Sequence, residues 1–265
     1  MQYKQIKVSS ILNKITTKDK LFAGDYTLDP YQNCEFGCLY CDSSFDKTIY
    51  IKTNTVEILK NELKNTNAGR IIIGSVHDPY QNIEKKYKTT RRILEIIKEY
   101  DFSCHILTKS DLVLRDLEII SDIKDSLVTI SLISLNKTVF SFFEKNVPSP
   151  QIRLQTIEKL KDAGIKTGLA VIPILPYVVE EELENIIKSA KKCEAEYLLH
   201  KHLELKGDQK TCFLDLLTKF NSDLVKKYED LYNESYIPKE EYIDGLNKTV
   251  EKLCKKYKIK NKIMM

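Results

Sequence analysis

Residues 70–108, RIIIGSVHDPYQNIEKKYKTTRRILEIIKEYDFSCHILT, decide the fold of this chain. They begin with one apolar run, RIIIGSV (70–76), and end with another, SCHILT (103–108). Between the runs, residues 85–100 carry isoleucine and leucine at helical spacing, which predicts a helix with one apolar side. Strands without polar alternation are buried on both faces, and strands joined through a helix pair in parallel. The stretch therefore predicts a strand–helix–strand unit of a parallel sheet.

The same alternation runs through most of the chain. Strands are expected at 25–29, 70–76, 103–108, 126–133, 166–175 and 195–200, and helices at 55–65, 85–100, 112–123, 150–164 and 179–192. Six units are too few to close an eight-stranded barrel, so the pattern predicts an α/β fold, a partial (β/α)6 TIM-like barrel over residues 1–205. Two further helices, near 212–233 and 239–257, predict a C-terminal helical extension (206–265) packed on the same domain.

The composition of the 265 residues fits a globular protein. Hydrophobic residues make up 42% and charged residues 30%, and the net charge of +4 is compatible with a nucleic-acid partner without indicating one. The chain has no run of 18 apolar residues, and its first residues lack the apolar core of a signal peptide. We therefore expect a cytoplasmic protein that does not enter a membrane.

The loops that follow the expected strands carry the chemistry of the chain. In barrels of this kind the active site lies in the loops after the carboxyl ends of the strands. The first such loop contains CEFGCLYC, from Cys34 to Cys41, with three of the seven cysteines in the spacing C-x3-C-x2-C. In a reducing compartment, close cysteines indicate metal or redox chemistry rather than a disulfide framework.

Three interpretations of these cysteines can be compared. Buried small hydrophobes do not suit a segment that also carries Asn33, Glu35 and Asp42. Structural zinc binds four ligands. The remaining cysteines are scattered over expected strands and helices, so the fourth ligand would have to come from a distant part of the sequence. A [4Fe–4S] cluster is held by cysteine thiolates, and three cysteines would leave its fourth iron open for a cofactor.

The chain resembles the radical SAM superfamily. The signature of that superfamily, C-x3-C-x-(aromatic)-C, is matched by Cys34, Cys38, Tyr40 and Cys41. Over residues 20–205, the segments YTLDPYQNCEFGCLYC, GSVHDPYQNIEKKYKTTRRILEII, ILTKSDLVLRDLEII and PSPQIRLQTIEKLKDAGIKTGLAVIPILP together look like the spore photoproduct lyase-like, or DNA repair photolyase-like, radical SAM proteins.

The resemblance implies an enzyme with one [4Fe–4S] cluster that reductively cleaves S-adenosylmethionine to a 5′-deoxyadenosyl radical, which takes a hydrogen atom from a substrate. It also implies an electron donor such as flavodoxin or ferredoxin. By position, the three cysteines would hold the cluster. The implied S-adenosylmethionine contacts are Tyr40 and Ile172 for the adenine, His77 and Lys109 for the methionine group, and Ser131 for that group or the ribose.

One position departs from spore photoproduct lyase itself. Where that enzyme carries the cysteine that returns a hydrogen atom to the product radical, this chain carries Ser75, whose O–H bond is too strong for the role. We therefore expect a reaction other than repair of that lesion. Two kinds of substrate remain open: a nucleic acid that is repaired or modified, and a peptide or small metabolite. The alternative from another class is a non-catalytic iron–sulfur or zinc-binding protein that acts as a nucleic-acid or protein interaction module.

Two weaker patterns complete the sequence analysis. The basic segment KKYKTTRR (85–92) is expected to be a solvated helix face, and a polyanion is the other occupant to consider. His200 and His202 would share one face of a strand, where an ordinary pair at the barrel rim is expected before a substrate contact.

Overall fold

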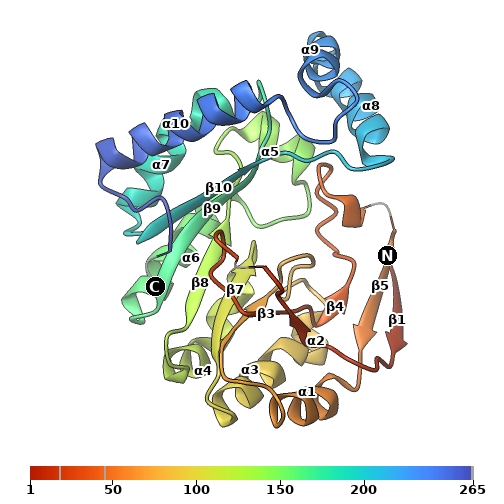
Figure 1. Cartoon of the computed structure of the whole chain (residues 1–265), viewed down its shortest axis with the longest axis vertical. Helices are drawn as coiled ribbons and strands as arrows, with labels where there is room; N and C mark the ends of the chain where they lie inside the picture. Colours follow the sequence, from red (N-terminus) through yellow and green to blue (C-terminus); the bar gives the residue numbers. More distant parts are fainter. Residues whose placement is uncertain (18, 45, 264–265) are drawn as a thin grey trace.

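The centre of the molecule is a seven-stranded sheet, in the order β10-β9-β8-β7-β6-β3-β2 (Figure 1). The computed structural model describes residues 1–17, 19–44 and 46–263. Every neighbouring pair from β3 to β10 is parallel, and β2 pairs with β3 in the antiparallel sense. The strands are β2 (Asn13–Lys14), β3 (Tyr26–Leu28), β6 (Arg70–Ile73), β7 (Ser103–Thr108), β8 (Leu127–Ser131), β9 (Lys166–Ile174) and β10 (Tyr197–His202). The predicted α/β fold with a mostly parallel sheet is confirmed.

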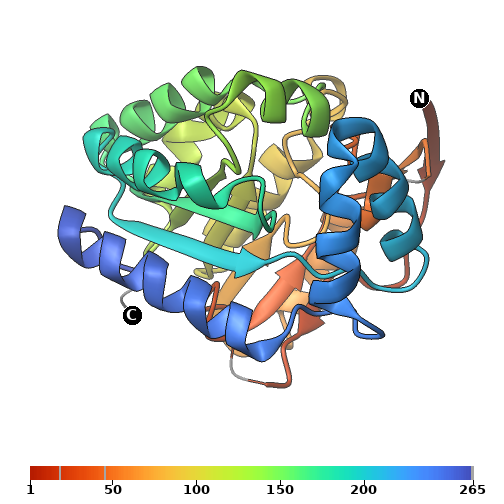
Figure 2. The same cartoon turned by 90° about the horizontal axis from the view of Figure 1, so that it is seen from above.

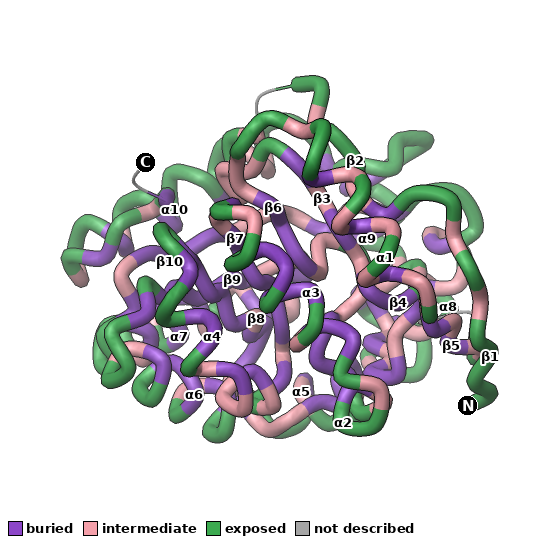
Figure 3. Tube along the Cα trace, turned by 90° about the horizontal axis from the view of Figure 1, so that it is seen from below, coloured by how far each residue is buried: buried purple, intermediate pink, exposed green. Residues whose placement is uncertain are grey.

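Helices connect the parallel strands, as the spacing of apolar residues predicts. They are α1 (Thr55–Leu63), α2 (Glu84–Tyr87), α3 (Thr89–Glu99), α4 (Leu117–Asp122), α5 (Lys137–Phe143), α6 (Pro150–Asp162) and α7 (Leu183–Lys192), with 3-10 turns η1 (Asp42–Ser44), η2 (Asp111–Asp116) and η3 (Glu180–Glu182). In Figure 3 the parallel strands of the large sheet are buried over most of their length, as are the inward sides of the helices. Within the described part of the chain, no helix combines the length and apolarity needed to cross a membrane.

Some expected helices are divided. The helix expected over 85–100 is two helices, because Lys88 between them adopts a left-handed conformation with φ of 50°. The helix expected over 212–233 is likewise two, α8 (Gln209–Asn221) and α9 (Asp223–Tyr232). The last helix, α10 (Glu240–Tyr257), agrees with the expected range to within one residue.

A second, three-stranded sheet was not expected from the sequence. Its order is β1-β5-β4, with β1 (Gln2–Ile6) parallel to β5 (Thr48–Lys52) and β4 (Tyr31–Gln32) antiparallel to β5. Because β4 ends just before the first cysteine of the motif, this sheet fixes where the cysteine loop begins. The side-chain amide of Asn33 strengthens the anchor by donating to the Thr48 carbonyl at 2.8 Å.

The inner side of the large sheet is filled by residues far apart in the sequence. Buried side chains of β8, β9 and β10 meet the N-terminal segment 21–23 and Ile263 near the other end of the chain. His105 of β7 holds that segment, since its Nδ1 lies 2.8 Å from the Phe22 carbonyl oxygen and its Nε2 lies 2.7 Å from Thr129 Oγ1. Gly168 is required here, because a Cβ atom would lie 2.1 Å from the ring of Tyr197.

The C-terminal helices pack against the rest of the molecule. Helix α10 contacts α7, and seen from above it lies along β10 at the edge of the sheet (Figure 2). After α10 the chain returns to that strand, where the Leu198 amide donates to the Lys260 carbonyl at 2.8 Å. Val250 and Cys254 of α10 belong to the main hydrophobic core.

Candidate active site

A cavity of about 350 Å³ lies at the carboxyl ends of the parallel strands. Its walls come from the cysteine loop, the loop after β6, the ends of β7, β8 and β9, and the segment between β10 and α8. Of the residues singled out in the sequence, it is lined by Cys34, Cys38, Tyr40, Cys41, Lys109, Ser131 and Ile172. Residues from six separate segments thus meet where a barrel of this kind carries its chemistry.

The cysteine loop is shaped by backbone conformations that few residues adopt. Asn33 and Gly37 have φ angles of 66° and 55°, and the amide of Cys41 donates to the Cys38 carbonyl at 3.0 Å, which closes a turn. Burial raises the pKa of Cys38 to about 12, although the charge of Lys109 acts in the opposite direction. Burial likewise raises the pKa of Cys34. Such thiols lose their protons when a metal centre binds them, so the donor set fits soft metal chemistry.

The arrangement of the sulfur donors bears on which metal centre fits. Among the residues that the structure describes, no three His, Cys, Asp or Glu side chains are grouped closely enough to hold a single metal ion. All three motif cysteines nevertheless face the same cavity. Cysteine thiolates are the ligands that hold iron–sulfur clusters, so this donor set fits a [4Fe–4S] cluster.

Tyr40 lines the cavity, and its hydroxyl is held from behind. The hydroxyl donates to the Glu144 carboxylate, which in turn pairs with Arg153 at 2.5 Å. Arg153, fully buried, also donates to the carbonyl oxygens of Ser131 at 2.9 Å and Pro148 at 2.7 Å. This chain of bonds connects the cysteine loop, the end of β8 and α6, and so fixes two walls of the cavity relative to each other.

Lys109 follows β7 and stands beside Asp78 and Cys38. Burial disfavours its charge, but Cys38, Glu144 and Asp78 more than offset this effect and raise its pKa. Asp78 accepts hydrogen bonds from the Lys109 amide and the Thr108 hydroxyl, each at 2.7 Å. Burial nevertheless raises the pKa of the Asp78 carboxyl. A fixed cation and a carboxylate in one wall can pair with the carboxylate and the ammonium of an amino-acid group.

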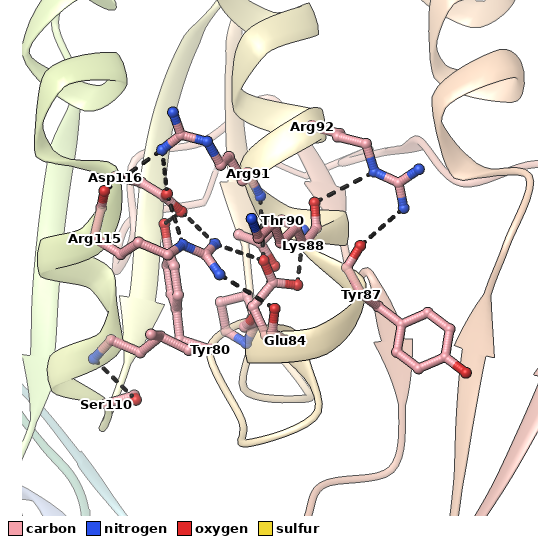
Figure 4. A network of polar contacts seen from close by, with 12 residues as sticks. Tyr80, Glu84, Tyr87, Lys88, Thr90, Arg91, Arg92, Ser110, Arg115 and Asp116 are labelled. Atoms are coloured by element: carbon pink, nitrogen blue, oxygen red, sulfur yellow. Dashed lines mark hydrogen bonds and ion pairs between the residues drawn. The ribbon is translucent and has the colours of Figure 1, made fainter.

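The loop that carries Asp78 is held by a buried ion-pair network (Figure 4). Arg115 pairs with Glu84 and with Asp116, each at 2.7 Å, and Arg91 reaches Asp116 at 2.8 Å. The Tyr80 hydroxyl donates to Asp116 at 3.1 Å. Both carboxylates are fully buried, so the network anchors the residues next to Asp78 rather than lying on the surface.

His77 is not among the residues that line the cavity. Its amide donates to Asp29 at 3.2 Å, and its buried Nδ1 has no hydrogen-bond partner among the described residues. Burial, together with the charge of Lys52, lowers its pKa. Ser75 and Asp78 of the same loop do line the cavity.

The cavity is also lined by residues that were not assigned to the site from the sequence. They are Phe22, Phe36, Asp78, Glu204, Lys206 and Gln209. The signal for part of this wall was present in HKHLELKG, the loop after the sixth expected strand. His202 lines the cavity, whereas His200 lies near Asn247 and Asn261, because the register shifts between the two histidines.

The chain belongs to the radical SAM superfamily, whose family model matches residues 28–190. It is therefore an enzyme, and its cofactors are a [4Fe–4S] cluster and S-adenosylmethionine.

Its similarity extends to particular proteins of that kind. An uncharacterized protein of Mycobacterium tuberculosis is 27% identical over 278 residues, which cover 97% of this chain and 81% of the relative. An uncharacterized protein of Methanocaldococcus jannaschii is 29% identical over 245 residues, 88% of each chain. A spore photoproduct lyase variant with bound AdoMet and dinucleoside spore photoproduct shares the fold, with a TM-score of 0.73 at 16% identity, over 96% of this chain and 79% of that one.

Proposed function

We propose that Cys34, Cys38 and Cys41 hold one [4Fe–4S] cluster, and that S-adenosylmethionine binds beside it in the cavity of about 350 Å³. The observation that carries this proposal is the meeting of all three cysteines with Lys109 on one cavity at the carboxyl ends of the strands. When bound, the cluster and S-adenosylmethionine supply a one-electron cleavage that yields a hydrogen-abstracting radical.

The residues of the chain bind and orient these groups. Lys109 pairs with the methionine carboxylate, and Asp78, held by the amide of Lys109, accepts from the ammonium. Ser131 contacts the methionine group or the ribose, while Tyr40 and Ile172 pack on the adenine. His77, whose backbone amide donates to Asp29, would lie near the methionine group. The cavity walls exclude water from the reacting atoms.

The proposal extends to the frame that presents the site. We propose that the six parallel strands, β3 to β10, curve as a partial (β/α)6 barrel over residues 1–205. Residues 206–265 would then be a helical extension of the same domain that closes the wall beside the substrate. Gln209 supports this role, since it lines the cavity and its side-chain amide donates to the Tyr40 carbonyl at 2.7 Å. The proposed location is the cytoplasm, where thiols stay reduced.

For the substrate we propose a nucleic acid whose lesion or base is modified. The fold is shared with a protein solved with a dinucleoside, and Lys201 and Lys206 stand in the cavity wall, where a phosphate would compete with Glu204 for these two cations. Ser75 also lines the cavity, so a hydroxyl replaces a thiol there. The reaction proposed is therefore distinct from repair of spore photoproduct, and turnover of that lesion by the purified protein would refute this distinction.

The proposal is tested with protein purified without oxygen and reconstituted with iron and sulfide. Reduction with dithionite in the presence of S-adenosylmethionine should release 5′-deoxyadenosine. Cys38→Ala should abolish both the cluster absorbance and this product, whereas Cys212→Ala, a half-buried cysteine of α8, should retain both. A cluster that forms equally well in Cys38→Ala, or wild-type protein that binds zinc in place of a cluster, would support the non-catalytic alternative.

A further inference from the structure

The outer side of the cysteine loop borders a basic face. The face consists of Lys85 and Lys86 of α2, Lys88 after it, and Arg92 of α3, all of them exposed. These residues belong to the segment expected to be a solvated helix face. The structure adds where that face lies and what its neighbours are.

The segment just before this face, residues 81–83, contacts the residue that follows the first cysteine of the motif. Glu35, which follows Cys34, accepts from the Tyr3 hydroxyl and from the Ile83 amide, each at 2.6 Å. Its own amide donates to Gln81 at 2.8 Å. The residues just before α2 therefore clamp the cysteine loop directly. The four cations of this face are not among the residues that line the cavity proposed for the cofactor.

The charges of this face are not compensated as those of the neighbouring network are. Arg91 pairs with Asp116 and Glu118, whereas Arg92, one residue later, donates to the backbone carbonyls of Tyr87 and Lys88 (Figure 4). Within residues 1–17, 19–44 and 46–263, no carboxylate forms an ion pair with any of the four cations of the face. The buried carboxylates beside α2 and α3 are therefore paired within the network. The exposed side of these two helices carries a net positive charge.

We propose that this basic face is the docking site for an acidic one-electron carrier protein, of the flavodoxin or ferredoxin class. The inference rests on the proposed function, because a cluster at the three cysteines is the electron acceptor. One electron leaves the reduced flavin or iron–sulfur centre of the carrier, which is oxidised by one electron, and the cluster is reduced by one electron. A carrier docked here would lie beside the segment that holds the cysteine loop, on residues that do not line the cavity. Charge complementarity selects an acidic partner and speeds its encounter.

The test compares two reductants in three proteins. The face variant is Lys85→Glu with Lys86→Glu, and neither lysine is placed at the cofactor site. The matched control is Lys188→Glu with Lys192→Glu on α7, two exposed lysines outside the cavity wall. Both double variants change the net charge of the protein by the same amount. Release of 5′-deoxyadenosine is followed with dithionite, with reduced flavodoxin and with reduced ferredoxin, at low and at high salt.

With at least one of the two carriers, the face variant should lose about tenfold in rate at low salt, and the loss should shrink as salt screens the charges. The control variant should change by less than about twofold, and all three proteins should react alike with dithionite. Equal losses in both variants, no loss in the face variant, or failure of both carriers with wild-type protein would overturn the assignment. Loss of binding to a single-stranded oligonucleotide in the face variant, with carrier rates unchanged, would assign the face to nucleic acid instead. Failure of wild-type protein with dithionite would refute the proposed function itself.

Discussion

Replacement of Arg153 by methionine should destabilise the protein far more than the loss of an ordinary ion pair. Arg153 and Glu144 are both fully buried, and the guanidinium makes three bonds, at 2.5 Å to Glu144, 2.9 Å to the Ser131 carbonyl and 2.7 Å to the Pro148 carbonyl. Methionine fills similar space without any of them. Removal of one partner leaves the other charge buried without compensation, which costs about 3–5 kcal/mol.

The assay is denaturant unfolding of the metal-free protein under reducing conditions, followed by circular dichroism. The double variant Arg153→Met with Glu144→Gln should recover a large part of the loss, because the charge left behind is then gone. Lys161→Met is the matched control, since its pair with Glu196 at 2.9 Å is about one-third exposed on each side and contributes no more than about 1 kcal/mol. A cost below about 1 kcal/mol for Arg153→Met alone would refute the reasoning.

Three further outcomes are expected. Gly168→Ala should lower the free energy of unfolding by about 1–3 kcal/mol, because the added Cβ would lie 2.1 Å from the Tyr197 ring; an unchanged denaturation midpoint would contradict this. Lys109→Met should weaken S-adenosylmethionine binding about 10- to 100-fold in calorimetry while the cluster absorbance stays, whereas Lys188→Met, at an exposed position of α7 outside the cavity wall, should bind normally. Burial lowers the pKa of His105 from 6.5 to about 4 in the folded protein, so the unfolded chain takes up the proton first, and stability should be full above pH 6.5 and fall between pH 6.5 and 4. In His105→Gln the unfolding free energy should depend less steeply on pH over that range, and an unchanged slope would contradict the assignment.

The sequence predicted the large sheet well because its strands are buried on both faces. A run such as RIIIGSV has no polar alternation, and this pattern is hard to mistake when helices flank it. The small sheet was not predicted, because β1 is exposed along almost its whole length and β4 is only two residues long. Neither strand carries a periodic hydrophobic pattern. The break between α2 and α3 at Lys88 was not predicted. Lysine does not indicate a left-handed conformation, whereas glycine or asparagine would.

The candidate site was predictable where chemistry depends on spacing. The number and spacing of the three cysteines indicate a metal site. Lys109 follows a strand whose end could be located from the sequence. The pairing of Glu144 with Arg153 could not be foreseen, since two charged residues read as surface until tertiary packing buries them. Whether His77 or Asp78 lines the cavity depends on a shift of one residue in a loop. Hydrophobic periodicity does not locate loop residues with that precision.

Phe22 forms part of the cavity wall, and behind it the segment 21–23 and Ile263 fill the inner side of the sheet. The side chains of segment 21–23 and Ile263 therefore pack against β8, β9 and β10 next to the wall that Phe22 contributes. A long substrate seated across the loops at the carboxyl ends of the strands would block the exit of methionine and 5′-deoxyadenosine on that side. Release of these two products would then follow the departure of the substrate.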